Sequence, residues 1–561
     1  MKTLKKFFWP ILLLIIIILS FFTLLRSGFF PMQDDMQVFR LVELDKCVKD
    51  LQLPCRWVPD AGFGYGYPQF NYYAPLVYYA GEAFHLSGLQ YIDSTKIVII
   101  LGFVLGALGM YLLVNEFFGG FAGMVAGVLY TIAPYKAQEV YVRGSISEFF
   151  ANLFFPLILW SIYKTIQKGE KRYYFFTALL IGGLFFTHNL FAFLFIPVII
   201  FWAGFWLVVE KKIYLWTKIV AVLIAGFLIS ASFVLPVIFE KGYAHTETLL
   251  GGYFDYRQHF VTIQELFVSN HWGYGSSQLG PNDDLSLSTG QIHWIMGVLA
   301  VITAFFTFKK KRNISILILG LGVAEVFMLF LMHEKSSFIW SAISFLAWLQ
   351  FPWRLLSFSV LILSFLAGYL VSNFGKARYF IGIAAIAAVL VLHGNFFKPQ
   401  IWLNITDSAK LSGPMWDKEL TASIFDYLPI YAKLPPPSKA PDLPEVLTGK
   451  AIFTNYFKGS DYQKGNLNVL TNARIRLPLF DFPGMTVYLN NSVVAHNHDN
   501  CSNEPFCMGL ISFDAPKGDY KFSVKLQDTP IRTVGNIVSL LSLFGILIWF
   551  FKKDKRSLVK S

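Results

Sequence analysis

Residues 7–35 read FFWPILLLIIIILSFFTLLRSGFFPMQDD. The run Phe7–Leu25 is almost wholly apolar and long enough to cross the ~30 Å hydrocarbon core of a bilayer. Three lysines precede it and no small-x-small cleavage site follows it. The run therefore predicts a retained membrane anchor rather than a removed signal peptide. Two adjacent carboxylates, Asp34 and Asp35, stand just after the chain leaves the membrane.

The composition extends this prediction to the whole chain. Of 561 residues, 55% are hydrophobic and only 15% are charged, whereas soluble domains carry about 25% charged residues. Eleven further apolar runs approach spanning length, so we expect a polytopic α-helical membrane protein with about twelve spans. These runs are 95–114, 121–137, 147–163, 173–189, 190–208, 215–238, 293–308, 314–332, 355–372, 379–397 and 535–551.

The distribution of charge gives the orientation. The net charge is +12, but the short segments between alternate spans hold 20 of the 47 Lys and Arg residues and only 4 of the 35 Asp and Glu residues. This is the positive-inside bias of a membrane protein and not a nucleic-acid footprint. We therefore expect a multi-pass protein of the cell membrane with both termini cytosolic and its long loops outside. The segments assigned to the cytosol in this count are 1–6, 114–120, 164–172, 209–213, 309–313, 373–378 and 552–561.

Two further apolar segments, Tyr72–Leu89 and Ser337–Trp353, are ambiguous between spanning and surface positions. Counting only one of them as a span would place basic loops on the outer side, against the positive-inside rule. We therefore expect both to lie along the outer surface, as interfacial helices or re-entrant pieces.

The four cysteines fall on the side that the charges make external. Two short-range disulfides, Cys47–Cys55 and Cys501–Cys507, would suit an oxidising exterior. Four free thiols are the alternative. The sequence has no CxxC spacing, so a zinc cluster is not indicated.

The chain divides into three parts. Residues 1–397 form a transmembrane core with a large external loop at 26–94, and residues 534–561 form the last span and a basic cytosolic tail. Between them, 398–533 are expected to be an extracytoplasmic linker and β-sandwich, because a proline-rich spacer is followed by short alternating runs separated by turns.

The first external loop opens with a helix signal. Asp34 followed by Gln37 has the spacing of a capping box. Val38, Leu41 and Val42 then recur at helical intervals. This pattern predicts a short amphipathic helix lying at the membrane interface.

Asp34 is the candidate general base, since a base must reach the proton that it removes. Neighbouring helical residues point ~100° apart, so Asp35 is expected to support the site or to hold a cation. Helix capping is the alternative role for Asp34. The metal requirement stays open, with a divalent cation as one alternative and no certain cofactor.

Four other side chains are candidates for binding substrate or phosphate. Arg143 and Arg354 stand at the outer ends of predicted spans, and a guanidinium matches a phosphate in bidentate fashion; snorkelling to lipid headgroups is their alternative role. Glu148 lies inside an apolar run and needs a partner such as Arg143, in a structural or a functional pair. His188 could orient an acceptor or a phosphate, or be a hydrogen-bonded structural residue.

These motifs resemble the GT-C superfamily of membrane glycosyltransferases, in which an acidic motif follows the first span. The closer resemblance is to the 6-pyruvoyl-tetrahydropterin synthase-related membrane proteins and their YfhO-like neighbours. It is carried by Arg143-Gly144 with Glu148, by Thr187-His188-Asn189 and by Gln350-Phe351-Pro352-Trp353-Arg354. The terminal domain resembles the YfhO-type sandwich through Phe482-Pro483-Gly484, although Met485 stands where Trp is usual.

The resemblance implies transfer of a sugar from a polyprenyl-phosphate carrier to a cell-envelope acceptor, which could be a glycan, lipid or protein, on the outer face. It places Asp34 at the catalytic acidic position and Arg354 at a phosphate-binding one. A transporter or flippase of lipid-linked sugars and a non-catalytic envelope-assembly protein are the alternatives. The sequence does not name the donor sugar, the acceptor or the oligomeric state.

Overall fold

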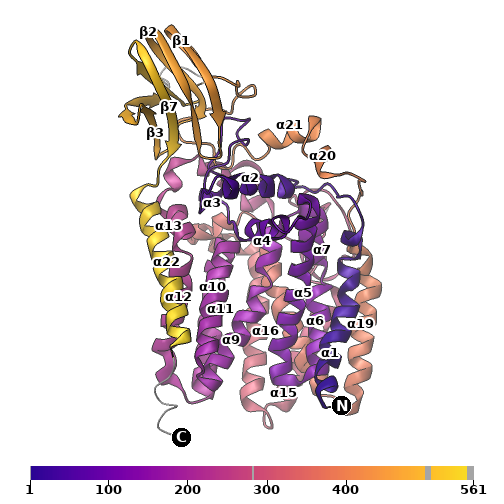
Figure 1. Cartoon of the computed structure of the whole chain (residues 1–561). Coiled ribbons are helices and arrows are strands. Elements are labelled where there is room, and N and C mark those ends of the chain that lie inside the picture. Colours follow the sequence, from indigo (N-terminus) through magenta and orange to yellow (C-terminus); the bar gives the residue numbers. More distant parts are fainter. Residues whose placement is uncertain (1, 281–282, 499–506, 553–561) are drawn as a thin grey trace.

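The computed structural model describes residues 2–280, 283–498 and 507–552. It is a bundle of long helices with a β domain standing at one end (Figure 1). Helix α1 (Lys2–Ile17) begins, and α22 (Pro530–Phe551) ends, at the opposite end of the bundle. The prediction of a helical membrane protein with a C-terminal β domain is confirmed.

Seven helical segments of the described chain are long and apolar enough to cross a membrane. They are α5 (Tyr91–Phe118), α8 (Ile146–Ala151) with α9 (Phe154–Lys168), α11 (Asn189–Val209), α16 (Arg312–Met332), η11 (Pro352–Leu355) with α18 (Leu356–Ser372), η12 (Gly375–Ala377) with α19 (Arg378–His393) and η13 (Gly394–Phe396), and α22. A broken pair, η4 (Ile213–Leu215) with α12 (Trp216–Ile229) and then α13 (Ala231–Phe239), bends by 76° and would be an eighth.

The remaining predicted spans coincide with shorter helices. Helices lie at all twelve predicted positions, but only seven or eight meet the length and apolarity expected of a span, so the count of twelve stays a prediction. The shorter ones are α1, continued by η1 (Ile18–Ser20) and η2 (Phe22–Leu25), and α6 (Gly120–Thr131), α10 (Lys171–Thr187) and α15 (Gln291–Thr307).

Helix α18 is the centre of the bundle. Every residue from Leu356 to Val371 is buried, and α5, α6, α15 and α16 pack around it. A helix that is apolar all round is stable only in such a position. The short helix η11 precedes α18 directly, so the packing of α18 also fixes Trp353 and Arg354.

Short helices lie across the end of the bundle beneath the β domain (Figure 1). The ambiguous segments are among the short ones: α4 has ten residues and α17 has six, too few at 1.5 Å per residue to cross a bilayer. The short elements of the described chain are α2 (Gln37–Lys49), α3 (Gln69–Tyr72), α4 (Leu76–His85), α7 (Pro134–Gln138), η3 (Glu139–Arg143), η5 (Lys241–Tyr243), η6 (Thr246–Leu250), η7 (Gly252–Phe254), η8 (Tyr256–Gln258), α14 (Ile263–Phe267), η9 (Glu334–Ser336), α17 (Ser337–Ala342), η10 (Ser344–Leu349), α20 (Asp407–Lys410) and α21 (Gly413–Thr421).

Helix α2 is not the amphipathic surface helix that the sequence predicts. Ten of its thirteen residues are buried, three of them charged. The carboxylate of Glu43 accepts from the backbone N–H of Asp60 at 3.0 Å, and that of Asp45 accepts from the hydroxyl of Tyr91 at 2.6 Å. Charged side chains of α2 are therefore bonded to the following loop and to the start of α5, and Trp416 of α21 packs against Phe39 with ring centroids 5.1 Å apart.

The predicted capping box is also wrong. The N-cap of α2 is Met36, and no side chain caps the helix. The amide Nε2 of Gln37 instead donates to Oδ2 of Asp34 at 3.0 Å. The Asp34–Gln37 spacing therefore brings two side chains together without closing the helix terminus.

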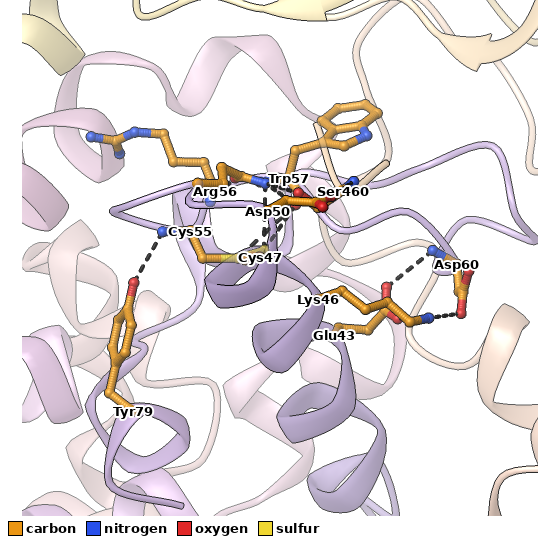
Figure 2. Close-up of a disulfide and its surroundings, with 11 residues drawn as sticks. Glu43, Lys46, Cys47, Asp50, Cys55, Arg56, Trp57, Asp60, Tyr79 and Ser460 are labelled. Atoms are coloured by element: carbon orange, nitrogen blue, oxygen red, sulfur yellow. Dashed lines mark hydrogen bonds and ion pairs between the residues drawn. A yellow bond between two sulfur atoms is a disulfide. The ribbon is translucent and has the colours of Figure 1, made fainter. Parts of the chain in front are cut away.

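A disulfide between Cys47 and Cys55 ties the end of α2 to the following loop (Figure 2). The backbone N–H of Cys55 donates to the hydroxyl of Tyr79 at 3.0 Å. Lys46, in the last turn of α2, pairs with the carboxylate of Asp60 (Figure 2). The loop is thus fixed to both α2 and α4. The second predicted disulfide, Cys501–Cys507, includes Cys501, which lies outside the described residues.

Hydrogen bonds join the described strands into one antiparallel sheet in the order β4-β3-β7-β2-β6-β5, with β1 also paired to β2. The first part of β2 pairs with β7 and its last part with β6. The sheet therefore folds over, and Phe513 of β6 stacks on Phe522 of β7 with centroids 5.7 Å apart. The two layers of the predicted sandwich are therefore the two halves of one bent sheet. The strands are β1 (Glu445–Lys458), β2 (Tyr462–Phe480), β3 (Met485–Leu489), β4 (Ser492–Val494), β5 (His496–His498), β6 (Leu510–Ala515) and β7 (Gly518–Leu526).

The first part of the linker before the sheet is bonded to the bundle end. The backbones of Leu403 and Phe29 exchange two hydrogen bonds of 2.8 and 3.0 Å. The carboxylate of Asp407 accepts from the N–H groups of Tyr91 and Ile92, at 2.7 and 3.0 Å, at the start of α5. An acidic side chain there satisfies N–H groups that have no partner within the helix. Most residues of the proline-rich part, 435–444, are exposed.

A buried ion pair fastens the last helix to the rest. Nε of Arg532 donates to Oε2 of Glu240 at 2.9 Å, and the two side chains are 0% and 2% exposed. The amide of Asn71 donates to the same oxygen at 3.1 Å, and the hydroxyl of Thr529 donates to the other. The hydroxyl of Tyr72 donates to the backbone carbonyl of Glu240 at 2.7 Å. This network joins α22, α13 and α3.

Replacing Arg532 by Met should strongly destabilise the protein, because it leaves Glu240 buried without its partner, at a cost of about 3–5 kcal/mol. The thermal midpoint of the detergent-purified protein measures the effect. Arg474→Met is the matched control, since Arg474 pairs with Asp514 at 3.5 Å on the exposed sheet surface, where such pairs contribute about 0–1 kcal/mol. Equal midpoints for the two variants would contradict the prediction.

Candidate active site

A cavity of about 640 Å³ opens at the end of the bundle that carries α2 and α3. Among the sequence-predicted residues, Asp34, Arg143, Glu148, His188 and Arg354 all line it, and Asp35 does not. Residues that are up to 320 positions apart in the chain therefore meet in one place.

Glu148 holds the two arginines together. Its Oε1 and Oε2 accept from NH1 and NH2 of Arg143 at 2.9 and 3.0 Å, a bidentate geometry. Oε2 also accepts from Nε of Arg354 at 3.0 Å, and the hydroxyl of Tyr135 donates to Oε1 at 2.6 Å. One carboxylate thus serves two guanidinium groups, and the cluster keeps a net positive charge.

Aromatic rings and the preceding turn fix the arginines further. The guanidinium of Arg143 lies 4.4 Å from the ring centroid of Trp353, and that of Arg354 lies 4.8 Å from the ring centroid of Phe351. NH1 of Arg354 donates to the carbonyl of Leu349 and to Oε1 of Gln350 at 2.7 and 2.9 Å. Its NH2 makes no hydrogen bond to the described residues, so donors of Arg354 remain for a ligand.

Asp34 faces a third arginine. Its Oδ2 accepts from NH1 of Arg40 at 2.8 Å and from Gln37, whereas Oδ1 makes no hydrogen bond to the described residues. Arg40 is buried, with Tyr73 and Tyr78 hydroxyls 3.3 and 3.4 Å from its NH1. Asp34 is thus oriented through one oxygen and open at the other.

The backbone around Asp34 is bonded to the turn that carries Arg143. The N–H groups of Gln33 and Asp34 donate to the carbonyls of Val142 and Arg143, both at 2.9 Å. The side-chain amide of Gln37 donates to the carbonyl of Gly144 at 2.8 Å. Because η3 forms a π turn here, a deviation common at functional sites, the carboxylate and the arginine cluster are positioned by the same few residues.

Asp35 points elsewhere. Its Oδ2 pairs with Nζ of Lys410 at 3.0 Å, and Lys410 also pairs with Glu419 at 2.8 Å. Burial raises the pKa of Asp35 above its ordinary value, and Lys410 opposes that rise. Asp35 therefore meets a cation, but that cation is a lysine of the linker, and Asp35 connects the linker to the start of α2.

His188 begins α11. Its Nδ1 accepts from the N–H of Phe191 at 3.2 Å, which makes it the N-cap of that helix. Burial lowers the pKa of His188 to about 4, so the imidazole is neutral near pH 7. The neutral tautomer with Nδ1 as acceptor carries its proton on Nε2. His188 contributes a structural cap and lines the cavity.

One wall of the cavity is apolar. It is formed by the ends of α11 and α13 and by η10, and two of its side chains, Ile238 and Phe345, are 40% and 44% exposed. These side chains give the charged cavity one apolar side. Its residues are Leu190, Phe193, Val237, Ile238, Phe345 and Trp348.

Sequence reasoning missed several lining residues. Arg40 belongs to a helix that was assigned to the surface, and Asp426 and Tyr427 belong to the linker before β1. No local pattern marks them, because only the folded linker brings them to the cavity. In the described chain no group of three or more His, Cys, Asp or Glu side chains is arranged to hold a metal ion, so no step below is assigned to one.

The fold and this site define a polytopic membrane protein whose charged cavity lies at one end of its helix bundle. The family model described as "6-pyruvoyl-tetrahydropterin synthase related domain; membrane protein" matches residues 70–394, more than half of the chain. The chain belongs to this family. The match includes the Arg143–Glu148–Arg354 cluster but neither Asp34 nor Asp426.

Two solved structures are similar to the chain, at low sequence identity and low TM-scores. The apo oligosaccharyltransferase of Archaeoglobus fulgidus has a TM-score of 0.44 and 14% identity over 72% of this chain and 57% of its own. The mycobacterial arabinofuranosyltransferase AftD has a TM-score of 0.47 and 14% identity over 71% of this chain and 27% of its own. The chain thus spans little more than half of the length of the first structure and about a quarter of the length of the second. At such TM-scores neither likeness assigns an activity. No curated protein matches the chain.

Replacing Gly144 by Ala should loosen the contact between the Asp34 loop and η3. Gly144 has φ +67°, and a Cβ there would lie 2.3 Å from Sδ of Met32. Gly169→Ala is the matched control, since Gly169 has φ +66° and ψ +17°, close to the φ +67° and ψ +22° of Gly144, with open space around it, and it reports only the backbone strain of about 1–2 kcal/mol. Gly144→Ala should lower the thermal midpoint more than the control does. Equal shifts would show that Met32 yields freely.

Proposed function

We propose that the protein is a glycosyltransferase that moves a sugar from a polyprenyl-phosphate carrier to a cell-envelope acceptor on the outer face of the membrane. The observation that carries this proposal is one cavity lined by a carboxylate with an open oxygen, Asp34, and by two guanidinium groups, Arg143 and Arg354. Transfer from a lipid phosphate needs these two things: a base for the acceptor proton and cations for the leaving phosphate.

Asp34 acts as the general base in this proposal. Oδ2 is held by Arg40 and Gln37, so Oδ1 is free to receive the proton of an acceptor hydroxyl. The acceptor oxygen forms a bond to the anomeric carbon of the sugar while the bond from that carbon to the carrier phosphate breaks. Arg40 holds the carboxylate in place, so little reorganisation accompanies the transfer.

The arginine cluster stabilises the departing phosphate. Arg143 and Arg354 are 8% and 13% exposed, so water and salt screen their charge weakly. Glu148 offsets one of the two charges and leaves about one positive charge for the phosphate. Arg354 keeps NH2 available and is the more direct ligand.

The apolar wall suits the prenyl chain of the carrier. A lipid-linked donor must place its phosphate among polar groups while its hydrocarbon stays in the bilayer. The residues from α11, α13 and η10 give the cavity an apolar wall, which would contact the part of the hydrocarbon next to the phosphate.

Two observations support an extracytoplasmic site. The cavity lies at the end of the bundle opposite to the start of α1 and the end of α22 (Figure 1), and the charge distribution assigns those ends to the cytosol. The Cys47–Cys55 disulfide lies on the cavity side, which suits an oxidising compartment.

Asp34→Asn should lower sugar transfer by about 10²-fold or more, the usual contribution of a general base. The assay measures product from a labelled polyprenyl-phosphate sugar in membranes with matched expression. Asp417→Asn, at an exposed carboxylate of α21, is the control and should retain activity. Undiminished product from Asp34→Asn would remove Asp34 from the mechanism.

Arg354→Ala should raise the donor KM by about 10–100-fold, since a hydrogen bond to a charged group contributes about 1.5–3 kcal/mol. The acceptor KM should change much less. Initial rates at varied donor and fixed acceptor, and the reverse, separate the two effects. Lys398→Ala removes an exposed cation and serves as the control. Equal changes in both KM values would argue against a phosphate-binding role.

A further inference from the structure

A second carboxylate, Asp426, lines the cavity beside the proposed base. It makes no ion pair among the described residues. Arg40 and Asp34, the charged groups that act on its pKa, line the same cavity. Burial raises the pKa of Asp426 to about 6, and its carboxyl oxygens can accept hydrogen bonds.

The turn that carries Asp426 is held rigidly. Ser423 adopts φ +54°, a conformation that costs a non-glycine residue about 1 kcal/mol or more. The hydroxyl of Tyr67 lies 3.1 and 3.2 Å from the carbonyls of Ser423 and Ile424 and accepts from the N–H of Tyr427 at 2.5 Å. One buried tyrosine thus fixes both ends of the turn. Strain kept in this way is common at ligand sites.

Two aromatic rings stand beside this carboxylate. The rings of Tyr427 and Tyr72 are stacked, with centroids 5.4 Å apart and planes at 28°, and both line the cavity. The hydroxyl of Tyr72 is fixed by the backbone of Glu240 at 2.7 Å. Rigid aromatic surface next to a carboxylate can contact the apolar C–H face of a sugar while the carboxylate accepts hydrogen bonds from its hydroxyls.

We infer that Asp426, Tyr427 and Tyr72 form an acceptor subsite for a sugar residue, so that the acceptor is a carbohydrate. This inference rests on the proposed glycosyl transfer. The acceptor hydroxyl attacks the anomeric carbon, the bond to the carrier phosphate breaks, and the proton goes to Asp34. Asp426 takes no part in these bond changes; it accepts hydrogen bonds from hydroxyls next to the attacking one and positions the ring.

The test uses the purified full-length protein and two reactions of one labelled polyprenyl-phosphate sugar. The first is hydrolysis of the donor without acceptor, and the second is transfer to methyl glycosides. Asp426→Asn should lower kcat/KM for the glycoside by about tenfold or more, as loss of a charged hydrogen-bond acceptor does, and leave donor hydrolysis within about twofold of the unmodified protein. Asp417→Asn should change neither rate.

A binding measurement separates failure of this inference from failure of the proposed function. Saturation-transfer NMR with the same methyl glycosides, and with a glycine-rich peptide amide for comparison, requires no donor chemistry. The unmodified protein should bind a glycoside and not the peptide, and Asp426→Asn should lose the signal. If the protein cleaves no donor, the proposed function fails, and this measurement alone decides the subsite.

Three results would overturn the subsite. The first is that Asp426→Asn transfers to the glycoside, or binds it, as well as the unmodified protein does. The second is that this variant loses hydrolysis and transfer equally. The third is that the protein binds the peptide in preference to every glycoside. If Asp426→Asn fails to fold, Tyr427→Leu replaces it. That variant removes the stacking ring and should show the same split between hydrolysis and transfer.

Discussion

The cavity depends on the double use of Glu148. Arg143 and Arg354 both lie within hydrogen-bond distance of the Glu148 carboxylate. Without that carboxylate, their two positive charges would repel each other. Arg143 and Arg354 come from different parts of the bundle, η3 and η11, and each is backed by an aromatic ring. Burial makes their charges strong and also makes an unpaired one costly. One shared carboxylate satisfies both requirements, since it holds the two cations together and leaves part of their charge for a ligand.

The remaining parts of the site come from segments outside the matched family region. The loop after α1 brings Asp34, and the linker before β1 brings Asp426. Both are tied to the bundle by backbone hydrogen bonds, those of Asp34 to η3 and those of the linker to Phe29. The helices therefore carry the arginine cluster, and the segments around it carry the two carboxylates. Under the proposed function, changes in these segments would alter the acceptor without altering the spans.

Strong, long-range physical rules account for what could be predicted from the sequence. Spanning length gives the bundle, and the cost of a buried charge points to Arg143 as the partner of Glu148. The failures come from tertiary packing. Periodicity assigned α2 to the surface because it does not register that Asp60 and Tyr91 bond its charged side chains. Asp426 was missed because its place in the cavity depends on Tyr67, which lies 359 positions earlier in the chain. Neither contact leaves a local pattern.

The contact between Glu240 and α22 has a consequence for biogenesis. Tyr72, which lines the cavity, is held by the backbone of Glu240, and the carboxylate of Glu240 is neutralised by Arg532. Helix α22, which carries Arg532, is the last of the described helices to be synthesised. It follows that a nascent chain inserted as far as α19 has the arginine cluster but lacks Arg532, so Glu240 lies beside Tyr72 as a buried carboxylate without its cation. The cavity wall at Tyr72 is therefore settled only after α22 has docked.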